Sequence, residues 1–129
     1  PNPDSYLGEG LTLQRSLADY LHELLAAKGL KRADVYRASG LNSTVVYDAF
    51  SGKSRLGRDN ALMVAFGLGC SLRETQRLLK LAGAAELYPK VRRDAIIIWC
   101  IDRGMSREAC DDELWRFGEK TLLGTCPLQ

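Results

Sequence analysis

Residues 38–55 read ASGLNSTVVYDAFSGKSR, and this stretch decides the fold. A Ser-Gly-Leu turn at 39–41 ends one short segment, and Asn42 then stands where the N-cap of a new helix belongs. That helix ends at Gly52, and the loop Gly-Lys-Ser-Arg begins there. Two short helices joined by such a turn are typical of a helix-turn-helix, whose second helix lies against nucleic acid. A connecting loop in an ordinary helical bundle is the alternative interpretation.

The helix that follows Asn42 has two different faces. Apolar side chains at helical spacing form the face that packs on the preceding helix: Val46, Ala49 and Phe50. Polar side chains near the helix start form the opposite face: Ser43, Thr44, Tyr47 and Asp48. The N-terminal end of a recognition helix meets the base edges in the major groove. We therefore expect these four polar residues to face the bases of DNA.

Cations flank the same helix on both sides. Lys31 and Arg32 stand at the start of the preceding helix, where free backbone amides and positive side chains suit a phosphate. Lys53 and Arg55 follow the helix and are placed to hold the neighbouring backbone. We expect these residues and the N-cap to contact DNA phosphates: Lys31, Arg32, Asn42, Lys53 and Arg55.

Charge is distributed unevenly along the chain, although the formal net charge is only +2. Residues 28–58 carry seven basic and two acidic side chains, whereas residues 1–27 carry one basic and four acidic. Residues 59–129 carry ten of each. The positive excess coincides with the helix-turn-helix segment, as expected for a nucleic-acid-binding surface. A solvated basic helix face without a partner is the competing interpretation.

The rest of the chain also has helical periodicity, and few segments alternate as strands do. We expect an all-α fold in three parts: an irregular arm at 1–15, a helix-turn-helix domain at 16–83 and a helical extension at 84–129. Caps and apolar spacing predict helices over these ranges: 16–28, 32–38, 42–52, 59–68, 71–83, 90–103 and 106–117.

From about Leu17 to Leu79 the chain resembles the lambda-repressor-like helix-turn-helix domain of the XRE family of transcriptional regulators. Three segments carry the resemblance: LLAAKGLKRADVYRASGLNSTVVYDAFSGKSR (24–55), NALMVAFGLG (60–69) and SLRETQRLL (71–79). It implies a five-helix DNA-binding bundle, here extended by a C-terminal αα-hairpin, that commonly binds a paired operator as a dimer. It also implies that Arg32 contacts phosphate and braces the recognition helix, and that Lys53 lies in a backbone-contacting loop.

The predicted function is therefore sequence-specific binding of double-stranded DNA by a homodimeric transcriptional regulator. One departure from the family favours an alternative: the exposed face after Asn42 lacks the Arg, Gln and Asn side chains that commonly read guanine and adenine. Asp48 can accept a hydrogen bond from cytosine but is repelled by phosphate. The alternative is a protein-interaction adaptor or antitoxin-like module that reuses the fold.

The C-terminal part contains a second hairpin pattern. Residues 94–118 align with residues 60–83 if one gap is allowed, although amphipathic hairpins with short turns commonly look alike. The segment AIIIWCI at 95–101 is apolar all round, so it must be buried on more than one side. Aromatic residues are enriched in interface cores. We expect a dimer or partner interface built on Trp99, Trp115 and Phe117, with a plain core role for Trp99 as the alternative.

An enzyme is not expected, nor is any metal or cofactor. The single histidine, His22, reads as a surface or packing residue, and the acidic run 111–113 reads as a solvated helix face. The Gly-Lys-Ser at 52–54 lacks the upstream glycine of a phosphate-binding loop.

The four cysteines form no CxxC pair and read as reduced thiols, with Cys70, Cys100 and Cys110 in mainly apolar stretches. The longest apolar run, 95–101, is too short to span a bilayer. No secretory-signal pattern opens the sequence, so we expect a cytoplasmic protein without a membrane partner.

Overall fold

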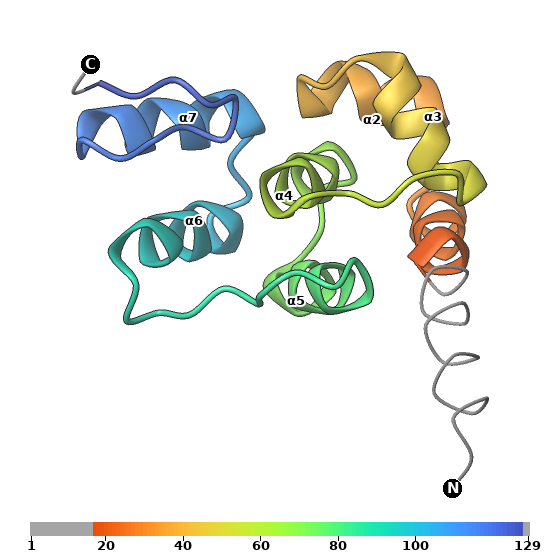
Figure 1. The fold of residues 1–129 in the computed structure, drawn as a ribbon, viewed down its shortest axis with the longest axis horizontal. Coiled ribbons are helices and arrows are strands. Elements are labelled where there is room, and N and C mark those ends of the chain that lie inside the picture. Colours follow the sequence, from red (N-terminus) through yellow and green to blue (C-terminus); the bar gives the residue numbers. More distant parts are fainter. Residues whose placement is uncertain (1–16, 128–129) are drawn as a thin grey trace, which may run out of the picture.

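The structure is a computed structural model that describes residues 17–127, and the described chain consists of helices joined by turns and irregular loops. The N-terminal helix is described over residues 17–27. Six further helices follow (Figure 1): α2 (Arg32–Ser39), α3 (Ser43–Ser51), α4 (Arg58–Gly67), α5 (Leu72–Leu81), α6 (Arg92–Asp102) and α7 (Arg107–Arg116). The all-α prediction is confirmed, and the predicted ends of these six helices are right to within two residues. The predicted arm at 1–15 lies outside the described residues.

Helix α4 is the centre of the molecule. Figure 1 shows it between α2 and α3 on one side and α6 and α7 on the other, with α5 beneath it. Its residues 61–65 are all buried, because neighbouring helices cover it on several faces. Gly67 lets α4 approach α2 closely, since a Cβ added there would lie 2.6 Å from the carbonyl oxygen of Val35.

The pairs α4–α5 and α6–α7 form two hairpins with the same turn geometry. Gly69 and Gly104 both have a φ of 66°, and Ser71 and Ser106 both cap the second helix through a side-chain oxygen. Helix α6 has 11 residues and α4 has 10. The one-residue gap in the sequence alignment therefore corresponds to the extra residue of α6.

Ion pairs fasten the start of α6 to the start of α4. Both terminal nitrogens of the Arg58 guanidinium donate to the carboxylate of Asp94, at 3.0 and 2.8 Å, and Arg58 also donates to the carbonyls of Ala85 and Glu86. Arg93 of α6 pairs in turn with Asp59 of α4 at 3.0 Å, so each helix supplies one cation and one carboxylate. These reciprocal pairs set how the C-terminal hairpin lies against α4.

The acidic run of α7 is not a uniformly solvated face, so that prediction was wrong. Asp111 is only 7% exposed. Arg107 donates to one of its carboxylate oxygens at 2.7 Å, and the backbone N–H of Leu122 donates to the other at 2.6 Å. The segment after α7 folds back over the helix and covers Asp111, whereas Asp112 remains exposed. Spacing along α7 alone did not indicate this return of the chain.

None of the helices in residues 17–127 is both long enough and apolar enough to cross a membrane.

Candidate nucleic-acid interface

The turn between α2 and α3 is fixed by local hydrogen bonds. Gly40 has a φ of 83°, a conformation that suits glycine because it has no Cβ. The hydroxyl of Ser39 donates to the carbonyl of Tyr36 and accepts from the backbone N–H of Leu41 at 3.1 Å. The Asn42 side-chain oxygen then accepts from the N–H of Val45 at 3.0 Å. Asn42 is therefore the predicted N-cap of α3, and its amide nitrogen stays available as a donor.

The apolar face of α3 is buried as predicted. Val46, Ala49 and Phe50 are at most 1% exposed. The edge of the His22 ring packs against the Phe50 ring, and His22 Nε2 lies 2.9 Å from the Phe50 carbonyl oxygen. The histidine is thus a packing residue that joins the end of α3 to the N-terminal helix.

The polar face of α3 is open at its start. Thr44 is exposed, and the other three predicted base-facing residues are half-buried: Ser43, Tyr47 and Asp48. Among α2 to α7, helix α3 packs mainly against α2. Helices α6 and α7 lie across α4 from α3 (Figure 1). Helix α7 approaches the α2–α3 turn through Arg107 at Gly40, and Thr44 stays exposed.

A cation lies directly on this face. The guanidinium of Arg32 lies 4.9 Å from the centre of the Tyr47 ring, and Tyr36 meets the same ring edge-on at 5.9 Å. Arg37 lies over the Tyr36 ring in turn. The sequence predicts a phosphate contact for Arg32 and a base contact for Tyr47, and the structure brings the two side chains together. Sequence reasoning missed Tyr36 and Arg37, although Tyr36 stands one helical turn after Arg32 on α2.

The basic patch is smaller than the sequence suggested. Lys28 pairs with Glu74 at 3.0 Å, and Arg58 pairs with Asp94 at 2.8 Å, so two of the seven cations between 28 and 58 are neutralised by residues distant in the chain. Five remain and define the cationic patch: Lys31, Arg32, Arg37, Lys53 and Arg55. Their positive charge is spread around α2 and the end of α3.

The start of α2 is less suited to a phosphate than predicted. The Asp34 carboxylate accepts from the backbone N–H of Lys31 at 2.9 Å and lies 3.8 Å from Arg37. A carboxylate in the first helical turn already balances the helix dipole and occupies one free amide. The Lys31 side chain remains exposed. Asp34 stands three residues after the N-cap, which is the capping-box position and the signal that could have found it.

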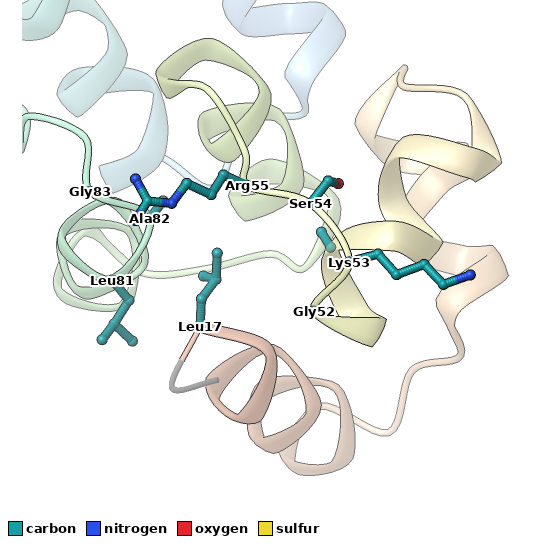
Figure 2. A pocket seen from close by; sticks show the side chains of 9 residues that line it. Leu17, Gly52, Lys53, Ser54, Arg55, Leu81, Ala82 and Gly83 are labelled. Atoms are coloured by element: carbon teal, nitrogen blue, oxygen red, sulfur yellow. The ribbon is translucent and has the colours of Figure 1, made fainter. Parts of the chain in front are cut away.

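The two cations after α3 point in different directions. Figure 2 shows the Arg55 side chain running from the loop toward Ala82 and Gly83, at the end of α5, and the Lys53 side chain extending the opposite way. These residues line a small cavity of about 80 Å³ with Leu17 and Leu81. The structure therefore places Lys53 and Arg55 apart, and a single phosphate group cannot be held by both in this arrangement.

The three predicted interface anchors are all exposed. Trp99 is 44%, Trp115 is 50% and Phe117 is 40% exposed. A plain core role for Trp99 is thereby contradicted within this chain. The apolar side of α6 that faces inward is formed by other residues: Ile97, Cys100 and Ile101.

No protein-family model matches the chain, and comparisons with curated proteins and with solved structures give no match either.

Proposed function

We propose that the protein is a DNA-binding transcriptional regulator whose α2 and α3 form a helix-turn-helix of the lambda-repressor-like type. Helix α3 enters the major groove with Thr44 foremost, and Arg32 contacts a phosphate beside it. The observation that carries this proposal is the Arg32–Tyr47 contact of 4.9 Å at the open start of α3. This contact places Tyr47, which is predicted to face the bases, beside Arg32, which is predicted to contact a phosphate.

The electrostatics of the surface support the proposal. All five residues of the cationic patch lie on α2, at its N-cap or in the loop that follows α3. Phosphate contacts position a recognition helix, and base contacts supply specificity. If the regulator acts as a dimer, its two α3 helices would read half-sites about one helical turn, roughly 34 Å, apart.

Salt-dependent binding to random duplex tests the proposal. Neutralised phosphates release counterions, so the logarithm of the binding constant falls linearly with the logarithm of salt concentration. Arg32→Ala and Lys53→Ala should each weaken binding to every sequence and reduce the slope by about 1. Lys80→Ala removes an exposed cation of α5 outside the patch and serves as the matched control, with no change expected.

A second candidate function is a protein-interaction adaptor or antitoxin-like module. The exposed face of α3 presents Thr44 and half-buried Ser43, Tyr47 and Asp48, without a side chain that makes a bidentate contact to guanine or adenine. Duplex binding that is absent at low salt, or that Arg32→Ala and Lys53→Ala leave unchanged, would favour this adaptor and overturn the regulator.

A further inference from the structure

Exposed apolar side chains are concentrated in one region of the molecule. Within the described residues, every large hydrophobic residue classed as exposed lies between 88 and 123: Tyr88, Val91, Trp99, Trp115, Phe117 and Leu123. The region from 17 to 87, which holds α2 and α3, exposes none. Contiguous apolar surface rimmed by polar groups marks interaction sites. Residues 88–123 are therefore the part of the described chain that offers large apolar side chains to solvent.

Part of this surface is shaped as a groove between α6 and α7. Its volume is about 400 Å³. Helix α6 contributes four residues spaced three, four and seven positions apart: Arg92, Ala95, Ile96 and Trp99. Helix α7 and its C-cap contribute Arg116 and Phe117. A row of this spacing along one helix is the arrangement against which a second amphipathic helix packs.

Cations border the groove. Arg116 lies over the Phe117 ring at 4.3 Å, and Arg103 lies over the Trp99 ring at the same distance. Arg92 and Arg116 have carboxylate partners, Glu119 and Glu113, outside the groove lining. Arg103 has no carboxylate within ion-pair distance among residues 17–127. No acidic residue lines the groove itself.

We propose that this groove binds an acidic amphipathic helix of another protein. The apolar face of that helix would pack on Ile96, Trp99 and Phe117. Its flanking carboxylates would meet Arg103 first, since Arg92 and Arg116 already pair with Glu119 and Glu113. A second copy of this chain fits less well, because a two-fold contact through the groove joins two surfaces that both carry arginines and whose groove linings both lack a carboxylate. The inference is independent of DNA binding, since residues of α6 and of the end of α7 line the groove, and Figure 1 shows these helices across α4 from α3.

Selection from a peptide library on the full chain tests the proposal. The library holds helices of about 16 residues with apolar positions spaced three, four and seven apart, and with Asp, Glu, Lys, Arg, Gln and Ser mixed equally at the flanking positions. Ile96→Glu places a carboxylate in the groove and is panned in parallel. The peptides recovered on the wild-type chain should be enriched in Asp and Glu over Lys and Arg.

Single peptides from this selection are then measured against defined variants. Ile96→Glu should weaken binding at least about tenfold, as truncating a central anchor does. Arg103→Glu should weaken it about threefold and less so at high salt. It breaks no ion pair within residues 17–127, and it removes the guanidinium from the face of the Trp99 ring. Tyr88→Ser, an exposed apolar residue outside the groove lining, should leave binding unchanged. Trp99 lines the groove and reports binding by fluorescence, and Trp115, the second tryptophan of the chain, is exposed outside the groove lining.

Several outcomes would overturn the proposal. They are a selection without recovered peptides, recovered peptides without acidic enrichment, and peptides that bind Ile96→Glu as well as wild type. A dimer in light scattering at micromolar concentration that Ile96→Glu converts to a monomer, and that acidic peptides do not dissociate, would assign the groove to a second copy. Circular dichroism of each variant separates lost binding from lost folding, and Arg103→Glu keeps the test decisive if Ile96→Glu unfolds.

Discussion

Arg107 lies against Gly40, so the first residue of α7 touches the turn between α2 and α3. A Cβ added to Gly40 would be 2.8 Å from Arg107 Nε, closer than such atoms approach one another. Arg107 is 8% exposed and donates to Asp111 at 2.7 Å, and Asp111 accepts from the N–H of Leu122. The α2–α3 turn, the start of α7 and the returning tail therefore meet around the buried Arg107–Asp111 pair.

Gly40→Ala should destabilise the fold more than Gly29→Ala. Both glycines have positive φ, 83° and 64°, so each substitution costs about 1–2 kcal/mol of backbone strain. Only at Gly40 does the new methyl group also displace Arg107, since nothing lies within 4 Å of a Cβ at Gly29. Urea unfolding of both variants measures the difference, and equal losses would contradict the Gly40–Arg107 contact.

Gly67→Ala should separate α2 from α4. The obstacle to its Cβ is the backbone carbonyl of Val35 at 2.6 Å, which cannot rotate away as a side chain can. Overpacking of this kind costs about 1–3 kcal/mol. Gly57→Ala is the control, because its Cβ meets nothing within 4 Å and its φ is −66°. A melting temperature for Gly67→Ala as high as that of Gly57→Ala would show that α2 shifts freely.

Asp94 should make stability depend on acid pH. Burial raises the pKa of its carboxyl, but hydrogen bonds from Arg58 and from the N–H of Tyr88 outweigh burial and hold the pKa below its ordinary 3.8. The contribution to stability is complete well above pH 3.8, where the carboxylate is ionised in both the folded and the unfolded chain. As the pH falls below that value the unfolded chain binds the proton first, and the contribution is lost on approaching the folded pKa.

Asp94→Asn should therefore lose about 2–3 kcal/mol at pH 7, at the low end for a broken buried pair because Arg58 is partly exposed. The loss relative to wild type should shrink as the pH is lowered through the acid range. Asp102→Asn changes an exposed carboxylate on the same helix and should have little effect. Urea midpoints at a series of pH values measure both variants, and a pH-independent loss would contradict the account.

The thiols should react in two groups. Burial, aided by the nearby Glu74, raises the pKa of Cys70 to about 12, and Cys100 and Cys110 are fully buried. Thiolate is the reactive species and the reagent must also reach it. The raised pKa of Cys70 and the complete burial of Cys100 and Cys110 should therefore make all three resist alkylation at pH 8 in the folded protein. Cys126 is partly exposed and should react first. Mass spectrometry after brief maleimide treatment should show one adduct on the folded protein and four adducts in denaturant. Rapid early modification of Cys70 would contradict this expectation.

Thr44→Ala should change which DNA sequences are preferred without changing stability, because Thr44 is exposed and lacks a hydrogen-bonded partner within the described chain. Tyr47→Ala should change preference and also weaken binding to all sequences, since it removes the ring beneath Arg32. Selection from a random duplex pool measures preference. If the effects of Tyr47→Ala and Arg32→Ala on affinity were strictly additive, the Arg32–Tyr47 contact would have no role in binding.

The helices of this protein follow from local sequence. Asn42, Ser71 and Ser106 each cap the helix that was predicted to begin there, and Gly40 and Gly52 end the helices before them. These signals act over a few residues, because a cap is a hydrogen bond between near neighbours. Apolar spacing likewise predicted the buried face of α3. The candidate interface could be located for the same reason, since one turn and one helix define it.

Tertiary structure decided which charges are free and which aromatic residues are exposed. In the sequence, Lys28 and Arg58 belong to the basic stretch. In the fold, Glu74 neutralises Lys28 from 46 residues away, and Asp94 neutralises Arg58 from 36 residues away. Asp111 was predicted to be solvated, but the backbone N–H of Leu122 donates to it in the folded chain. A core role was the alternative for Trp99, but Ile97 occupies the buried side of α6. Sequence by itself sets helix, cap and turn because those forces are short-ranged. Ion pairing and burial depend on residues far apart in the chain, so only the packed fold determines them.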